Sequence, residues 1–292
     1  MLIKLSIFRK NPIFKIVAIV LIIVISVFSI TEFLLLPLPI FGFHSIYDEN
    51  RLNDLPSRAS YLDYSLQNLE KLLIYLINND YWFLSNQEFY DYFVSHSKTI
   101  PKELQNTKPI MLTFDDGYKN IDVYLLPLLE TLQEKYNKSL KIVLYINPKQ
   151  MKSDKEQKKT RYLNCEDLKR GTELGFYDVQ SHGYSHTDLT RLTFQDLKYE
   201  LSESQQDLKT CLSNLSNRQI AAQHLAYPYN KVNKQVEQLT SHYYQSAYLF
   251  KSRLRHLLFL FDSYKIPRIG VSKKDSPKTL IQLARRYSSI SR

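Results

Sequence analysis

The stretch from Pro109 to Tyr118, PIMLTFDDGY, tells most about the fold. Its first six residues carry no charge and are typical of a buried strand, because strands of parallel sheets are short, continuous apolar runs. Asp115 and Asp116 follow this strand, and Gly117 then lets the chain turn. Two adjacent carboxylates repel each other, so a cation or a shared proton is needed to hold both in a cleft. A turn with both carboxylates in water is the alternative.

Strand and helix patterns alternate along the chain on both sides of this stretch. Repeated strand–helix units predict a parallel sheet with helices outside it, and about seven units favour a closed or nearly closed (β/α) barrel. The fold class is therefore α/β. Strands are predicted at 39–46, 109–114, 140–146, 176–181, 224–227, 245–249 and 266–271, and helices at 62–77, 88–94, 123–135, 165–174, from Thr193 as N-cap, and at 277–286.

A second polar motif, SHGYSH from Ser181 to His186, also follows a predicted strand. His182 and His186 are four residues apart, so they share one face if the segment turns helically, an arrangement that suits a divalent metal. The chain has only seven histidines, and a pair placed directly after a strand favours a ligand role over two unrelated surface residues.

A third motif, LAYPYN from Leu225 to Asn230, ends another predicted strand. Pro228 fixes a turn there and leaves the backbone N–H of Tyr229 free to point at a ligand. A simple connection from strand to loop is the alternative.

Together, the FDDG and SHGYSH motifs resemble those of the polysaccharide deacetylases with a NodB homology domain, carbohydrate esterase family four. The layout is closest to the poly-N-acetylglucosamine deacetylases, and the resemblance runs from roughly Pro39 to the C-terminus. It implies a metal-dependent hydrolase with a distorted (β/α) barrel of about seven strands.

The resemblance also implies roles for individual residues. Asp116, His182 and His186 would bind one divalent metal, most often zinc, with positions left open for water and substrate. Asp115 would be the general base that takes a proton from the attacking water. The metal and the backbone N–H of Tyr229 would stabilise the tetrahedral oxyanion.

The sequence departs from the family pattern at several positions. Gly183 replaces a serine or threonine whose hydroxyl braces the loop. Leu225 replaces the arginine that orients the catalytic aspartate. Arg268 could take over that orienting role, or it could be an ordinary salt-bridged arginine.

The family's C-terminal Leu-x-x-His motif, which supplies the general acid, is also missing. Phe41 to His44, FGFH, resembles the early strand that replaces this motif in the poly-N-acetylglucosamine type. His44 would then protonate the leaving amine, a task that suits an ordinary histidine pKa. The alternative is a barrel histidine bonded to backbone.

The N-terminus predicts a membrane anchor. Residues 16–30 carry no charge, four basic residues precede them, and extension through Leu36 reaches the length of about 20 apolar residues that spans a bilayer. The basic leader should stay in the cytoplasm. We therefore expect residues 1–36 to be a leader and single-pass anchor in the cytoplasmic membrane, with an extracytoplasmic deacetylase domain at 37–292. A cleaved signal peptide, giving a secreted protein, is the alternative, although no small-x-small cleavage site follows the run.

Composition excludes some partners and leaves others open. The net charge of +10 falls to +6 without the four basic leader residues, and the remaining basic residues are scattered, so nucleic acid is not an expected partner. The segment 149–161 holds six basic and two acidic residues and either guides an acidic glycan or is a solvated loop. Cys165 and Cys211 are either a disulfide or two buried thiols.

The function that these patterns favour is removal of N-acetyl groups from a cell-surface polysaccharide such as poly-N-acetylglucosamine, peptidoglycan or a chitin-like polymer. A metal-binding, carbohydrate-binding pseudoenzyme is one alternative, supported by the missing arginine. An O-acetyl esterase acting on xylan-like polymers is another, because amide and ester hydrolysis pass through the same kind of intermediate.

Overall fold

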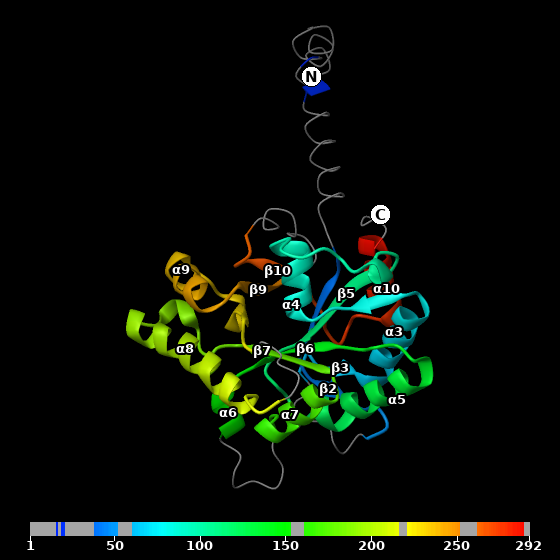
Figure 1. Cartoon of the computed structure of the whole chain (residues 1–292), viewed down its shortest axis with the longest axis horizontal. Coiled ribbons are helices and arrows are strands. Elements are labelled where there is room, and N and C mark those ends of the chain that lie inside the picture. The colour runs from blue at the N-terminus through cyan, green and yellow to red at the C-terminus, as the bar shows by residue number, and fades with distance from the viewer. Residues whose placement is uncertain are drawn as a thin grey trace, which may run out of the picture.

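Seven parallel strands form a closed barrel at the centre of the computed structural model (Figure 1). They follow the order β1-β10-β9-β8-β7-β6-β5, and β5 pairs back onto β1, with Phe41 opposite both Leu112 and Ile269. This arrangement confirms the predicted barrel. Its strands are β1 (Ile40–Phe43), β5 (Lys108–Phe114), β6 (Ile142–Ile146), β7 (Tyr177–Ser181), β8 (His224–Ala226), β9 (Ser246–Lys251) and β10 (Ile266–Gly270).

Three short strands lie outside the ring. β4 (Tyr81–Phe83) pairs with the first half of β5, and β2 (Ile46–Tyr47) pairs with β3 (Tyr64–Ser65) in a separate small sheet. β3 and β4 were not predicted from the sequence, because two or three residues are too few to show a strand period.

The structure describes residues 38–51, 60–152, 161–215, 221–251 and 262–288, together with Ile16, Ile19 and Val20. The predicted anchor therefore lies almost entirely outside the described residues. Among those that are described, none forms a helix long and apolar enough to cross a membrane.

Helices surround the barrel, with α8 and α9 on one side of the strands and α3, α5 and α10 on the other (Figure 1). Thr193 caps α8 as predicted, since its side chain accepts from the N–H of Asp196. The helices are α3 (Leu66–Asn78), α4 (Asn86–Phe89), α5 (Leu126–Tyr136), α6 (Pro148–Lys152), α7 (Cys165–Glu173), α8 (Phe194–Cys211), α9 (Lys234–Tyr243) and α10 (Pro277–Ser288), and the shorter helical turns are η2 (Tyr90–Val94), η3 (Lys102–Leu104), η4 (Ile121–Leu125), η5 (Leu189–Arg191) and η6 (Pro228–Asn230).

Side chains alternate between the two surfaces of each barrel strand. One set, which includes Phe114 and Ile142, packs with helix residues such as Leu129 in the outer core. The other set points into the barrel and forms a second apolar cluster with Met111 and Tyr145. Asp115 and Arg268 belong to this inward-facing set, and both are buried. The alternation therefore places the polar residues of the site inside the barrel.

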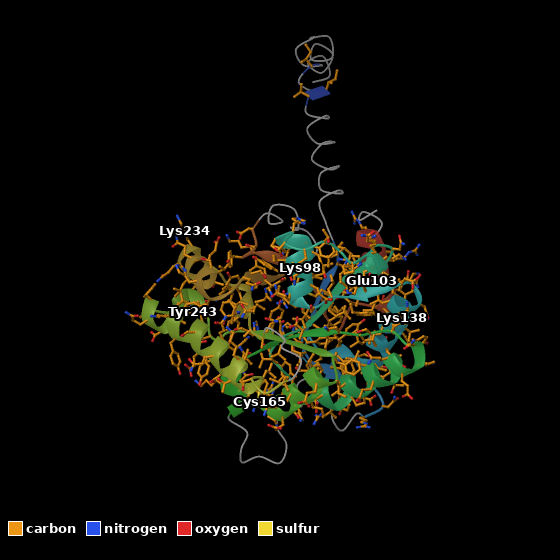
Figure 2. All side chains as sticks on the ribbon, in the orientation of Figure 1. Lys98, Glu103, Lys138, Cys165, Lys234 and Tyr243 are labelled. Atoms are coloured by element: carbon orange, nitrogen blue, oxygen red, sulfur yellow. A yellow bond between two sulfur atoms is a disulfide. The ribbon has the colours of Figure 1, made fainter. Side chains whose placement is uncertain are left out.

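Cys165 and Cys211 form a disulfide that joins the start of α7 to the end of α8, with Cα atoms 5.7 Å apart (Figure 2). Of the two possibilities left open by the sequence, the structure shows the disulfide. The bond ties together two helices that flank the strand leading into the SHGYSH motif.

Candidate active site

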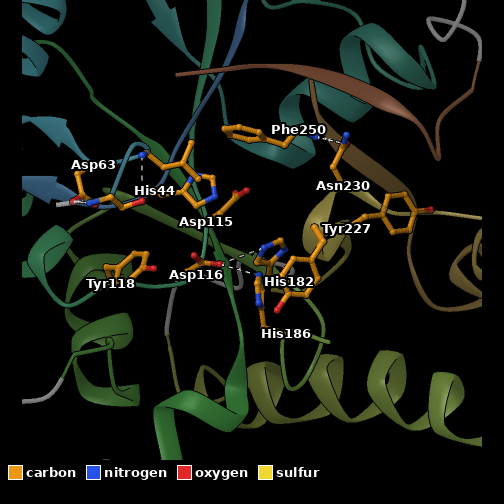
Figure 3. Close-up of a pocket in the computed structure, with 13 residues that line it drawn as sticks. His44, Asp63, Asp115, Asp116, Tyr118, His182, His186, Tyr227, Asn230 and Phe250 are labelled. Carbon is orange, nitrogen blue, oxygen red and sulfur yellow. Dashed lines mark hydrogen bonds and ion pairs between the residues drawn. The ribbon is translucent and has the colours of Figure 1, made fainter. Parts of the chain in front are cut away.

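A cavity of about 300 Å³ opens where the barrel strands end (Figure 3). It brings together the three predicted motifs and the first strand, although these segments are far apart in the sequence. Its lining residues are His44, Ser60, Leu62, Asp63, Asp115, Asp116, Tyr118, His182, His186, Tyr227, Tyr229, Asn230 and Phe250.

The three residues expected to bind a metal converge in this cavity. Asp116 Oδ1 lies 3.2 Å from His186 Nε2 and 3.5 Å from His182 Nε2, as the dashed lines in Figure 3 mark. One ligand atom from each of the three residues lies within 4.8 Å of the other two. Asp116 Oδ1 is buried, and it accepts no hydrogen bond of normal geometry from the residues that the structure describes. A buried acceptor facing two imidazole nitrogens is a donor set that fits a divalent cation.

The tautomer of His182 also suits a metal ligand. Its Nδ1 lies 2.7 Å from the backbone carbonyl oxygen of Ala226. Because a carbonyl oxygen can only accept, Nδ1 carries a proton, and in the neutral ring the lone pair lies on Nε2, which faces Asp116.

The SHGYSH motif forms a loop and not the helical turn that would have put its histidines on one face. Gly183 and His186 adopt left-handed backbone angles, with φ of 73° and 57°, and a chain with such residues cannot continue as a right-handed helix. The two histidines meet because the loop folds back on itself and not because they share a helix face. Asp116, with φ of 68°, is also left-handed, so both ends of the ligand set hold a backbone conformation that is costly for residues other than glycine.

Buried side chains from neighbouring elements hold this loop in place. The Asn147 amide donates to the carbonyl oxygens of His182 and Gly183, and Glu200 on α8 accepts from both the N–H and the hydroxyl of Ser185. These contacts brace the loop where Gly183 lacks the hydroxyl of the family pattern. Neither Asn147 nor Glu200 was identified from the sequence, because nothing in their local patterns marks them.

Arg268 reaches across the barrel to Asp115. Its Nη1 lies 2.6 Å from Asp115 Oδ1 and its Nη2 lies 2.8 Å from Oδ2, so the guanidinium holds both carboxylate oxygens. Arg268 is fully buried, and its guanidinium also stacks over the Tyr145 ring at 4.8 Å. Burial raises the pKa of Asp115, but the charge and hydrogen bonds of Arg268, together with the imidazoles of His182 and His44, outweigh burial and leave this pKa below its ordinary value. Asp115 is therefore an oriented, ionised carboxylate.

His44 lines the same cavity at the end of β1. Its imidazole meets the Phe250 ring edge-on, with ring centroids 4.8 Å apart. Its Nδ1 is buried and has no hydrogen-bond partner within the described part of the chain, so the alternative of a ring tied to backbone through Nδ1 does not describe it. Burial lowers the pKa of His44, and the nearby carboxylates of Asp115 and Asp116 partly oppose that shift.

The LAYPYN motif forms another wall of the cavity. Pro228 is buried and begins the short turn η6, in which Tyr229 has a left-handed φ of 56°. The Tyr229 ring lies 4.6 Å from the His186 ring and is 59% exposed. The side chain of Asn230 accepts a hydrogen bond from the backbone N–H of Phe250, which fixes the motif to β9.

Several cavity residues were not identified from the sequence. Asp63 is buried, lines the cavity and accepts from the N–H of Ser60 at 2.6 Å, but it belongs to none of the motifs. Phe250 lies on β9, where the apolar run gave no sign of a site. Tyr118 belongs to the first motif and stacks on Tyr162 with centroids 5.5 Å apart. Its position directly after Gly117, within the first motif, could have marked it as a cavity residue.

Comparisons with known proteins agree with this geometry. Residues 102–246 match the polysaccharide deacetylase family. No curated protein matches the chain.

Solved structures show the same fold. A polysaccharide deacetylase from Bacillus cereus, BC0361, is 21% identical with a TM-score of 0.66, over 84% of this chain and 68% of that one. The Streptococcus pyogenes deacetylase PplD, solved with acetate, is 19% identical with a TM-score of 0.67, over 85% and 97%. IcaB from Ammonifex degensii is 16% identical with a TM-score of 0.63, over 86% and 97%.

The matched residues 102–246 include the FDDG and SHGYSH motifs, whose aspartate and histidines meet in one cavity. The chain therefore belongs to the polysaccharide deacetylases with a NodB homology domain, a family of hydrolases.

Proposed function

We propose that this chain removes N-acetyl groups from a cell-surface polysaccharide, such as poly-N-acetylglucosamine, peptidoglycan or a chitin-like polymer, with one divalent metal, zinc. The observation that carries the proposal is the pairing of Asp115 with Arg268 beside the Asp116–His182–His186 cluster. A pseudoenzyme that only binds carbohydrate needs no oriented base. The absence of an arginine at position 225 was the argument for such a pseudoenzyme. Arg268 removes this argument, because it contacts Asp115 from another strand.

Asp116, His182 and His186 would hold the metal. Two imidazole nitrogens and a carboxylate are a ligand set that zinc accepts, and three protein ligands leave room for water and substrate. When bound, the cation would supply Lewis-acid chemistry by polarising the acetyl carbonyl and making water more acidic.

The remaining residues would move protons and stabilise charge. Asp115 would accept a proton from the water that attacks the acetyl carbon, and Arg268 would keep that carboxylate ionised and correctly turned. The backbone N–H of Tyr229, after the turn at Pro228, would donate to the oxyanion. His44 would give a proton to the sugar nitrogen as the C–N bond breaks. The products would be acetate and a free amine.

We further propose that residues 1–36 are a basic leader and single-pass anchor in the cytoplasmic membrane, and that residues 37–292 form the deacetylase domain outside it. The Cys165–Cys211 disulfide supports an oxidising compartment, because structural disulfides persist mainly outside the cytoplasm. A reporter enzyme active only in the cytoplasm, fused after Arg292, should be inactive. Full reporter activity would place the domain inside the cell.

The activity is tested by acetate release. The full chain, purified in a non-ionic detergent and loaded with zinc, should release acetate from chitooligosaccharides or poly-N-acetylglucosamine faster than from acetylated xylan. A chelator should abolish the release, and zinc should restore it. Faster release from xylan would identify an O-acetyl esterase, and release unaffected by the chelator would refute metal dependence.

A further inference from the structure

A second cavity of about 500 Å³ lies directly beside the active site. His186 and Tyr229 line both cavities, so the two are neighbours with a shared wall. The second cavity is otherwise formed by the start of α6, by the end of the SHGYSH motif with the loop and short turn that follow it, and by Lys231 after η6. None of its other lining residues has a role in the proposed reaction.

Positive charge dominates this second cavity. Lys149, Arg191 and Lys231 line it together with a single carboxylate, Asp188. His186, the remaining titratable imidazole there, is one of the proposed metal ligands. The lining therefore carries more positive than negative charge, which attracts an anionic ligand.

The Asp188 carboxylate forms ion pairs with two of these cations, Arg191 and Lys231. Asp188 Oδ2 lies 2.6 Å from Lys231 Nζ and 3.2 Å from Arg191 Nε. Its Oδ1 accepts from the N–H and the hydroxyl of Thr190, so both oxygens are engaged. Asp188 thus holds the two side chains side by side, and each keeps donor groups beyond those that contact Asp188.

Lys149, in the first turn of α6, supplies the third cation. Its backbone N–H donates to the carbonyl oxygen of Tyr184 at 3.1 Å, which fixes the first turn of α6 against the metal-binding loop. Its side chain is exposed and makes no ion pair with any residue that the structure describes. A charged side chain at a cavity wall, with no counter-ion among the described residues, can bind an anionic ligand.

Tyr229 lines both the charged second cavity and the active site. Its exposed ring stands between the two cavities and can stack against a sugar, since tyrosine offers an apolar face and a polar edge. A polysaccharide whose acetamide group enters the active site would then place a neighbouring sugar over Tyr229. A substituent on that sugar would enter the second cavity.

We propose that the second cavity binds an anionic group, a carboxylate or a phosphate, carried by the sugar next to the one that is deacetylated. This inference rests on the proposed function, because it takes a polysaccharide as the ligand. It narrows the substrate to an acidic glycan or a glycan with acidic branches.

Binding without turnover tests the inference separately from the activity. Three N-acetylglucosamine trisaccharides are compared, with a hydroxyl, a carboxylate or a phosphate at C6 of a terminal sugar. Their dissociation constants are measured by calorimetry on the zinc-loaded full chain carrying Asp115→Asn. The failure of acetate release would refute the proposed function, whereas these affinities do not depend on turnover.

At low salt, at least one charged trisaccharide should bind about fivefold more tightly than the neutral one, as expected for a few exposed ion pairs, and the preferred anion identifies the substituent. The preference should fall toward one in Lys149→Gln/Lys231→Gln. Lys138→Gln is the control (Figure 2). Lys138 is an exposed lysine that pairs with Asp80. Both residues precede the first residues of β6 and β4, so they lie at the end of the barrel away from the cavity. Equal affinities of the three ligands, or a preference that survives the double substitution, would overturn the inference.

Discussion

Arg268 determines the state of the residue on which the proposed chemistry depends. Its guanidinium contacts both oxygens of Asp115, and both side chains are buried. A buried carboxylate without a partner is costly, whereas a fork of two parallel hydrogen bonds fixes its charge and its direction. We therefore expect the pair to contribute to stability as well as to the proposed reaction.

Replacement of Arg268 should reveal both contributions. Arg268→Met leaves the Asp115 charge buried and unpaired, so the free energy of unfolding should fall by about 3–5 kcal/mol. Arg268→Lys keeps a charge but not the fork, and should lose less stability while acetate release still falls at least about tenfold. Denaturant unfolding and initial rates measure the two effects. A methionine variant as stable as the wild type would show that the pair does not form in solution.

His44 should matter for the rate and not for the metal. If it protonates the leaving nitrogen, His44→Gln should lower kcat by about 10²- to 10⁴-fold. The bound zinc, measured by mass spectrometry of the purified protein, should stay at the wild-type amount because His44 is not a ligand. A wild-type kcat would place the general acid elsewhere.

Some residues of the site could be predicted from the sequence, and others became apparent only in the structure. Asp115, Asp116, His182 and His186 could be predicted because each pair lies within one short motif. Arg268 was only one possibility, since its partner is 153 positions away and no local pattern links them. Asp63 could not be predicted at all, because only the closed barrel brings it to the cavity.

At the scale of elements, α7 and β7 show how closely the helices approach the barrel. An added Cβ at Gly171 would lie 2.1–2.5 Å from ring atoms of Tyr177, which is buried beneath α7. At Gly175, just after α7, a Cβ would meet nothing, but its φ of 85° disfavours any side chain.

Two alanine substitutions separate these effects. Gly171→Ala should lower the free energy of unfolding by about 1–3 kcal/mol or more, because the Tyr177 ring or the helix must move. Gly175→Ala should cost only about 1 kcal/mol, as a purely backbone effect. Chemical denaturation of both variants checks the order. Equal losses would mean that α7 does not pack on Tyr177 as closely as described.

Two segments show the limits of the sequence at this scale. The spacing of His182 and His186 allowed a helical turn, but left-handed residues turn 181–186 into a loop. Helix α9 was not predicted, although Asn233 caps its start and its sequence, KQVEQLTSHY, buries Val236, Leu239 and Thr240 on one face.

At the scale of the whole molecule, the barrel interior is more polar than the apolar strands suggest. Asp178, Gln180 and His224 are buried inside it and hydrogen-bonded to one another or to neighbours. A closed or nearly closed barrel could be predicted from the alternating elements. The polar interior could not, because polar residues within a strand do not reveal which surface is buried.

This interior should make stability depend on pH. Burial lowers the pKa of His224 from 6.5 to about 3, although the charge of Asp91 opposes the shift. The folded protein thus binds this proton more weakly than the unfolded chain, so stability is full above the unfolded pKa of 6.5 and is lost as the pH falls toward the folded value.

Between pH 7 and pH 4.5 this group should cost roughly 2–3 kcal/mol of unfolding free energy. His224→Gln cannot take up the proton, so it should lose that much less on acidification, whatever its stability at pH 7. Denaturant unfolding at both pH values gives the difference. The same loss in wild type and variant would show that His224 is not held neutral by burial.

The proposed activity depends on Asp115 acting as the base beside a metal held by Asp116, His182 and His186. The most direct test measures acetate release by wild type and Asp115→Asn, with the zinc content of each protein determined in the same sample. We expect nearly equal zinc, close to one per chain, and a fall in kcat of at least about 100-fold in the variant. An Asp115→Asn protein that releases acetate at the wild-type rate would contradict it.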